Sequence, residues 1–136
     1  MERAPTALCI ALFVLSRLPA AGQIRMTRIE TRKLVDAVLP ANEKRTPNLV
    51  IEVDREHDGC VVYHAYRDSP SLFAFTVGWW SIDTRTAEVW DELARKQVTE
   101  QRIAPIQRAI RKRLGVTDHE QTEAVSKPCY ERESSK

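Results

Sequence analysis

Cys60 and His64 are the residues of this chain that most suggest nucleophilic catalysis, because a thiol beside a histidine base can become an attacking thiolate. They lie four residues apart in a segment that is typical of a single β-strand. At about 3.3 Å of rise per residue, their Cα atoms would be about 13 Å apart, far beyond hydrogen-bond reach. We therefore predict no catalytic role for Cys60, and we expect His64 to be a core histidine beside Phe75.

Four neighbouring polar residues raise the question of a metal site: Asp54, Glu56, His57 and Asp58. Their spacing matches none of the common zinc or calcium ligand patterns. The sequence also lacks the GxSxG, HExxH and glycine-rich phosphate-loop motifs, and its four glycines leave little material for such a loop. We expect no metal, no cofactor and no enzymatic activity.

The overall charge argues against a nucleic-acid partner. The formal net charge is only +2, too small to bind DNA or RNA through bulk electrostatics. A local exception is a basic segment with no acidic residue between positions 102 and 113: Arg102, Arg108, Arg111, Lys112 and Arg113. This segment is either a solvated helix face or a contact surface for an acidic partner.

Residues 1–22 resemble a signal peptide. Arg3 precedes an apolar run over residues 7–15, and small residues around Ala20 and Gly22 offer a cleavage site. The run is too short to span a bilayer, so no stable membrane anchor is expected after cleavage. We predict a periplasmic or secreted protein. The alternative is that Met26 is the true start and the protein is cytoplasmic.

Removal of the signal peptide would leave two cysteines, Cys60 and Cys129. An even number of cysteines in an exported chain favours a disulfide bond. The closed loop would hold about 70 residues, for which the chain-entropy relation gives about 4 kcal/mol of stabilisation. Two reduced thiols are the alternative, favoured if the chain is cytoplasmic.

Residue patterns predict an α+β fold over residues 23–115, followed by a polar tail over 116–136 that is extended unless Cys129 pins it. Apolar stripes predict helices over 27–39 and 99–114, the second beginning at a Thr99 cap or later, near Ala104. Runs of β-branched and aromatic residues predict a four-stranded antiparallel meander with one helix before it and one after it, both packed on one face; the strands are 49–56, 60–67, 72–82 and 87–91. Residues 87–94 also suit a short helix.

Turns at 58–59, 68–71 and 83–86 set a strand register, and directly opposed residues share a face. One face is then expected to be the core: Ile51, Val53, Val62, Tyr66, Phe73, Phe75, Val77, Trp79 and Trp90. Two helices can cover only this face, so the other is expected to be open. The open face would bind a partner through Trp80 at its centre, with Val61, Tyr63, Ile82 and Val89 around it and Glu52, Asp54 and Glu56 at an acidic edge.

The segment Trp80-Ser81-Ile82-Asp83-Thr84-Arg85-Thr86-Ala87-Glu88-Val89 resembles a hairpin of PepSY-like domains, whose strands read aromatic-x-Val-Asp-x-x-Thr-Gly-x-Val. Ala87 stands where the family has glycine. The helix–meander–helix order with an export signal is similar to small bacterial envelope proteins, among them lysozyme inhibitors and immunity proteins that neutralise wall-degrading toxins. The resemblance implies a non-enzymatic binding protein.

These observations predict an exported protein that inhibits or neutralises another protein, such as a cell-wall hydrolase or toxin. Two alternatives use the same open face. It is either a binding site for a small molecule or peptide, or the interface of a self-associating structural protein that forms a homodimer.

Overall fold

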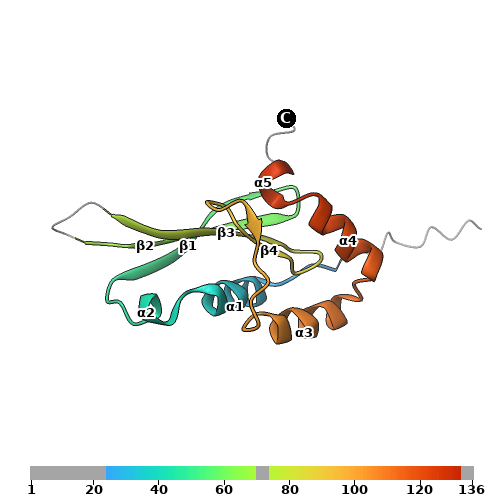
Figure 1. Cartoon of the computed structure of the whole chain (residues 1–136), viewed down its shortest axis with the longest axis horizontal. Coiled ribbons are helices and arrows are strands. Elements are labelled where there is room, and N and C mark those ends of the chain that lie inside the picture. The colour runs from blue at the N-terminus through green and yellow to red at the C-terminus, as the bar shows by residue number, and fades with distance from the viewer. Residues whose placement is uncertain (1–23, 70–73, 133–136) are drawn as a thin grey trace, which may run out of the picture.

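The computed structural model describes residues 24–69 and 74–132 and shows one antiparallel sheet with helices on both sides (Figure 1). Within these residues, neighbouring strands pair in chain order, β1–β2–β3–β4–β5. The strands are β1 (Leu49–His57), β2 (Cys60–Arg67), β3 (Phe75–Asp83), β4 (Val89–Asp91) and β5 (Lys96–Gln97). The helices are α1 (Arg28–Val38), α2 (Ala41–Lys44), α3 (Ala104–Leu114), α4 (Asp118–Ser126) and α5 (Cys129–Arg132). Helices α1 and α3 lie on one side of the sheet, and α5 lies on the other.

The predicted α+β class is confirmed, with the short edge strand β5 as a small addition. Strand β2 has the predicted bounds, and residues 89–91 are strand rather than helix. The proposed signal peptide and Phe73 lie outside the described residues.

Helix ends follow from local capping chemistry. Thr27 caps α1 by accepting a hydrogen bond from the Glu30 backbone N–H, while the Glu30 carboxylate accepts from the Thr27 N–H at 2.8 Å. Helix α3 begins at Ala104 with Pro105 in its first turn, so a Thr99 cap is wrong and the later start is right. It ends at Gly115, whose φ of 68° lies in the left-handed region that glycine tolerates.

The segment after Gly115 was expected to be extended unless Cys129 pins it; Cys129 does pin it, and the segment is helical. Thr117 and Glu120 form a second capping box, and α4 and α5 follow it. The sequence carries this signal in the same form as at α1, a threonine followed three residues later by a glutamate. Because the segment is polar, this capping pattern was not recognised as the start of a helix.

The first hairpin has the predicted register, with His57 opposite Cys60 across the Asp58-Gly59 turn. A β-bulge between Val53 and Arg55 then shifts the pairing, so that Val53 faces Tyr63 rather than His64. A bulge places an extra residue in one strand, which turns the rest of that strand to the other face. The predicted faces of the first half of β1 are therefore wrong.

The two later turns are longer than predicted. Cys60 was predicted to pair with Trp79 but pairs with Asp83, which lies four residues later in β3. Val89 was predicted to pair with Trp80 but pairs with Ile82, which lies two residues later. Because side chains alternate with a period of two, these even shifts keep residues 78–83 and 89–91 on their predicted faces. A second bulge shifts the register between Ala65 and Tyr66, so that Tyr66 pairs with Thr76, and it moves residues 75–77 to the opposite faces. For residues 78–83 and 89–91 the predicted grouping is right although the predicted pairs are wrong, and for residues 75–77 both are wrong.

The side chains predicted to form an open face are instead buried in the main core, against α1 and α3. This set comprises Val61, Tyr63, Trp80, Ile82 and Val89, each at most 6% exposed. Gly78 makes room for the Trp80 ring, because a Cβ at this position would lie 2.4 Å from Trp80 Cη2. The helices cover the face opposite to the one predicted, since both faces carry enough apolar residues to serve as a core.

The residues predicted to form the core divide into three groups. Val62 and Trp90 are buried on the α5 side of the sheet. Ile51 and Val77 are partly buried against the main core. Val53 is 38% exposed and Phe75 is 66% exposed, and Tyr66 and Trp79 are only partly buried. On the α5 side of the sheet, Val62 and Trp90 are thus buried near α5, whereas Tyr66 and Trp79 lie beyond it and stay partly exposed.

A buried ion pair fixes α3 against the turn between β3 and β4. The Glu88 carboxylate, whose side chain is 1% exposed, pairs with Arg111 and accepts a hydrogen bond from Gln97 at 2.7 Å. Arg111 also donates through Nε to the Thr86 carbonyl at 2.8 Å. Gln107 donates to the Ala87 carbonyl at the same distance. Part of the basic segment is therefore structural.

Replacing Arg111 with alanine is expected to lower the free energy of unfolding by about 2 kcal/mol, because a buried carboxylate would lose its cation. This is less than the loss of about 3–5 kcal/mol for a fully buried pair, since 17% of the Arg111 side chain is exposed. Urea unfolding measures the change. Arg108→Ala, at an exposed position of the same helix, is the control and should change stability by about 0.5 kcal/mol or less. Equal effects of both substitutions would contradict the structural role of Arg111.

Candidate functional site

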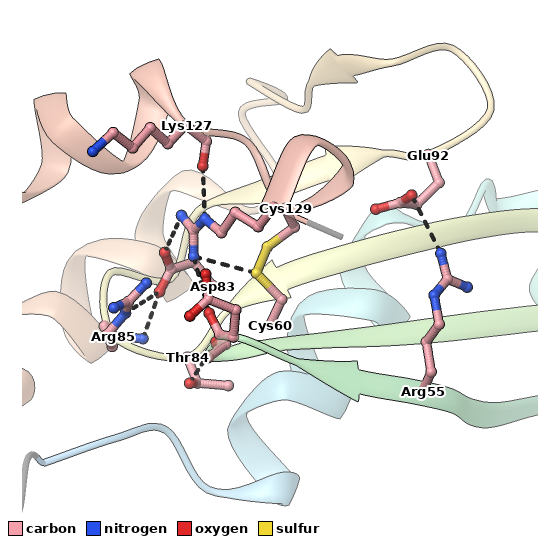
Figure 2. The surroundings of a disulfide bond; sticks show 11 residues. Arg55, Cys60, Asp83, Thr84, Arg85, Glu92, Lys127 and Cys129 are labelled. Atoms are coloured by element: carbon pink, nitrogen blue, oxygen red, sulfur yellow. Dashed lines mark hydrogen bonds and ion pairs between the residues drawn. A yellow bond between two sulfur atoms is a disulfide. The ribbon is translucent and has the colours of Figure 1, made fainter. Parts of the chain in front are cut away.

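The second face of the sheet is covered at one end by α5. A disulfide bond joins Cys60 on β2 to Cys129 on α5, with the two Cα atoms 6.0 Å apart, which confirms the predicted pairing (Figure 2). Beneath it lies the Trp90 side chain, 1% exposed, with Tyr130 packed against the same cluster. The disulfide and these two aromatic side chains thus form a small second core.

An ion pair at the same end holds α5 from its C-terminal side. Arg132 Nη2 lies 2.7 Å from Asp83 Oδ2, and Arg132 Nε donates to the Lys127 carbonyl at 2.8 Å (Figure 2). Asp83 is 1% exposed and also accepts a hydrogen bond from the Arg85 backbone N–H. Burial of this carboxylate is therefore compensated by charge and hydrogen bonds.

The part of this face that α5 leaves uncovered carries three aromatic rings, which we call the aromatic strip: His64, Tyr66 and Trp79. The His64 and Trp79 rings stack with centroids 3.9 Å apart and planes 10° apart. The His64 and Tyr66 centroids are 4.9 Å apart. His64 Nε2 lies 3.0 Å from the Thr76 hydroxyl, which orients the ring. All three rings keep partial exposure, so the strip is a platform rather than a core.

Acidic groups border the aromatic strip. Glu52 is exposed, and its Cα partner on β2 is His64. Partial burial raises the pKa of the Tyr66 hydroxyl, and the negative charges of Glu52 and Asp68 and a hydrogen bond to Glu52 raise it further. Tyr66 is thus protonated at neutral pH and donates to the Glu52 carboxylate.

The structure separates the three carboxylates that were predicted to share one edge. Glu52 lies beside the aromatic strip. Asp54 lies at the bulge of β1, 2.6 Å from Arg55. Glu56 pairs with Arg28 at the start of α1, on the other face. Of the predicted acidic edge, Glu52 lies on the uncovered face, to which the bulge of β1 moves it from the predicted face of Trp80.

The exposure predicted for Trp80, Tyr63, Val61, Ile82 and Val89 is wrong, because α1 and α3 cover them. Sequence reasoning instead missed Trp79 and His64 as surface residues and assigned both to the core. Gly78 and Ala65, which pair with each other, were the available signal. Two small residues on one face leave space for a large side chain there, and that side chain is Trp80.

The structure bears on two chemistries that the sequence suggested, a Cys60 nucleophile and a metal site. Cys60 is disulfide-bonded, so its sulfur is no thiolate nucleophile in this state. Within residues 24–69 and 74–132, no three His, Cys, Asp or Glu side chains lie together as metal ligands. Nor is any helix of this part of the chain long and apolar enough to cross a membrane.

A groove of about 590 Å³ lies near the turns of the sheet and α4. Charged side chains dominate its lining, and several of them pair with one another, as Asp83 does with Arg132 and Glu123 with Lys127. The charged groups in these pairs interact with each other and are therefore less available to bind a ligand.

No protein-family model and no curated protein matches the chain. A chain in the solved structure of a type VI secretion system effector–immunity complex from Pseudomonas protegens is similar in fold, with a TM-score of 0.62. The two chains are 16% identical, and the match covers 75% of this chain and 90% of that one. At this identity the likeness shows a shared fold.

Proposed function

We propose that this chain is an exported, non-enzymatic protein that binds and neutralises another protein, as an immunity protein neutralises a toxin. The observation that carries the proposal is the aromatic strip, a partly exposed surface of stacked rings at the uncovered end of the sheet. Aromatic residues dominate the energetics of protein interfaces. The fold shared with a chain of an effector–immunity complex supports a toxin as the partner.

The disulfide supports export. Disulfide bonds persist in oxidising compartments and are rare in the cytosol. The Cys60–Cys129 bond is therefore compatible with a periplasmic or secreted protein, as the proposed signal peptide requires.

Affinity capture of the tagged protein from envelope extract tests the proposal, and the expected result is one stoichiometric protein partner. Trp79→Ala should weaken this complex about thirtyfold, the loss typical of an interface hot spot. Tyr66→Ala gives a second reading, because it removes a different ring of the strip. Ile29→Ala is the matched control, since Ile29 is 82% exposed on α1 on the other side of the sheet.

Two results would count against the proposal. One is the recovery of no stoichiometric partner. The other is a complex that tolerates Trp79→Ala and Tyr66→Ala, which would place the contact elsewhere. A homodimer through the aromatic strip is the alternative, and sedimentation would then show a dimer that Trp79→Ala dissociates.

A further inference from the structure

The uncovered end of the sheet has a chemistry more specific than an apolar patch. Its centre is the stacked pair of His64 and Trp79, extended by the tilted ring of Tyr66. The hydrogen bond between His64 and Thr76 fixes the central ring in the free protein. The ring faces that meet between His64 and Trp79 cover each other, so a planar group has to stack on an outer ring face of the strip. Because the rings are already ordered, this binding has a lower entropic cost.

The charge beside these rings is negative. Glu52 borders the strip, and the raised pKa of Tyr66 reflects, after partial burial, the fields of Glu52 and Asp68. The neighbouring arginines are engaged by other carboxylates: Arg67 pairs with Glu43, and Arg55 lies 2.6 Å from Asp54. Arg55 also lies 3.8 Å from Glu92 (Figure 2). Aromatic faces carry negative potential of their own, so rings and carboxylate attract the same kind of group.

We propose that the aromatic strip and Glu52 form a receptor for an arginine side chain that the protein partner presents. The guanidinium group stacks on an outer ring face of the strip and donates hydrogen bonds to the Glu52 carboxylate. Arginine fits better than lysine, because its planar guanidinium both stacks on aromatic faces and forms paired hydrogen bonds with a carboxylate. This inference rests on the proposed function, since it names the chemistry that the partner brings to the same surface.

Short peptides test the receptor without the partner. Hexa-arginine is titrated into the oxidised protein while NMR follows the Trp79 indole N–H resonance, with hexa-citrulline as the uncharged isostere and hexalysine as the non-planar cation. We expect hexa-arginine to shift this resonance, hexa-citrulline to leave it in place and hexalysine to bind more weakly.

Two substitutions locate the contact. Glu52→Gln should weaken hexa-arginine binding about tenfold, as expected for the loss of one charge-assisted interaction. Glu123→Gln removes an exposed carboxylate from α4 and is the matched control, which should bind as wild type does. Glu52 is exposed, so its variant should fold, and circular dichroism checks this.

Equal binding of hexa-citrulline, equal binding of hexalysine, or wild-type affinity of Glu52→Gln would each overturn the arginine receptor. These results are independent of partner capture. A captured partner that Trp79→Ala releases but Glu52→Gln does not would sustain the proposed function while removing this inference. Binding of hexa-arginine without any captured partner would sustain the arginine receptor and count against the proposed function.

Discussion

Replacing both Cys60 and Cys129 with serine is expected to lower the free energy of unfolding by about 4 kcal/mol. The bond joins residues separated by 69 positions, so its loss returns the entropy of a long loop to the unfolded chain. It also removes the covalent link that holds α5 over Trp90. Helix α5 then keeps its packing, the ion pair between Asp83 and Arg132, and the hydrogen bond from the Tyr130 hydroxyl to the Arg95 carbonyl. Small domains typically lose 2–5 kcal/mol with a native disulfide.

Urea unfolding followed by far-UV circular dichroism measures this change, and wild type under reducing conditions should behave like the double variant. Val125→Ala on α4, where the side chain is 39% exposed, is the control and should stay within about 0.5 kcal/mol of wild type. A loss of about 1 kcal/mol or less in the double variant would show that the ion pair and packing suffice to hold α5. The folded state would then not need the disulfide, and so would not need the oxidising environment that export provides.

Local signals in the sequence predicted local structure well. Asp58 and Gly59 both have positive φ and form the turn of the first hairpin. Thr27 and Glu30 form the capping box at the start of α1. Each of these features depends on residues within a few positions of one another, so no tertiary information was needed. The bulge at Asp54 differs, because it depends on how β1 fits its partner along the whole strand.

The choice of the covered face could not be made from alternation. Alternation shows which side chains share a face, and both faces of this sheet carry large apolar residues. The prediction assumed that two helices exist and that one face is left open. The unpredicted α5 covers one end of the second face and buries Trp90 there, so the face contains both a small core and a partly exposed aromatic strip. The candidate site arises from this partial coverage.

The adjacent residues Trp79 and Trp80 provide a sensitive test of which face is buried. Trp80→Ala is expected to cost about 3–5 kcal/mol, because it would leave a cavity between Gly78 and the helices in the main core. Trp79→Ala is expected to cost about 1 kcal/mol, since its partly exposed ring loses mainly the stack with His64. Each variant is the control for the other, because both remove the same side chain from the same strand.

Thermal and urea unfolding of both variants measure this difference, and partner binding gives an independent reading with the opposite order. Among molecules that remain folded, Trp80→Ala should retain affinity for the partner, whereas Trp79→Ala should lose it. Equal destabilisation by the two substitutions would mean that a further element covers the aromatic strip, which would then be unable to receive a partner. A larger stability loss for Trp79→Ala would mean that α1 and α3 pack on the other face of the sheet. If the aromatic strip is the binding surface, Trp80→Ala must lose mainly stability and Trp79→Ala must lose mainly affinity for the partner.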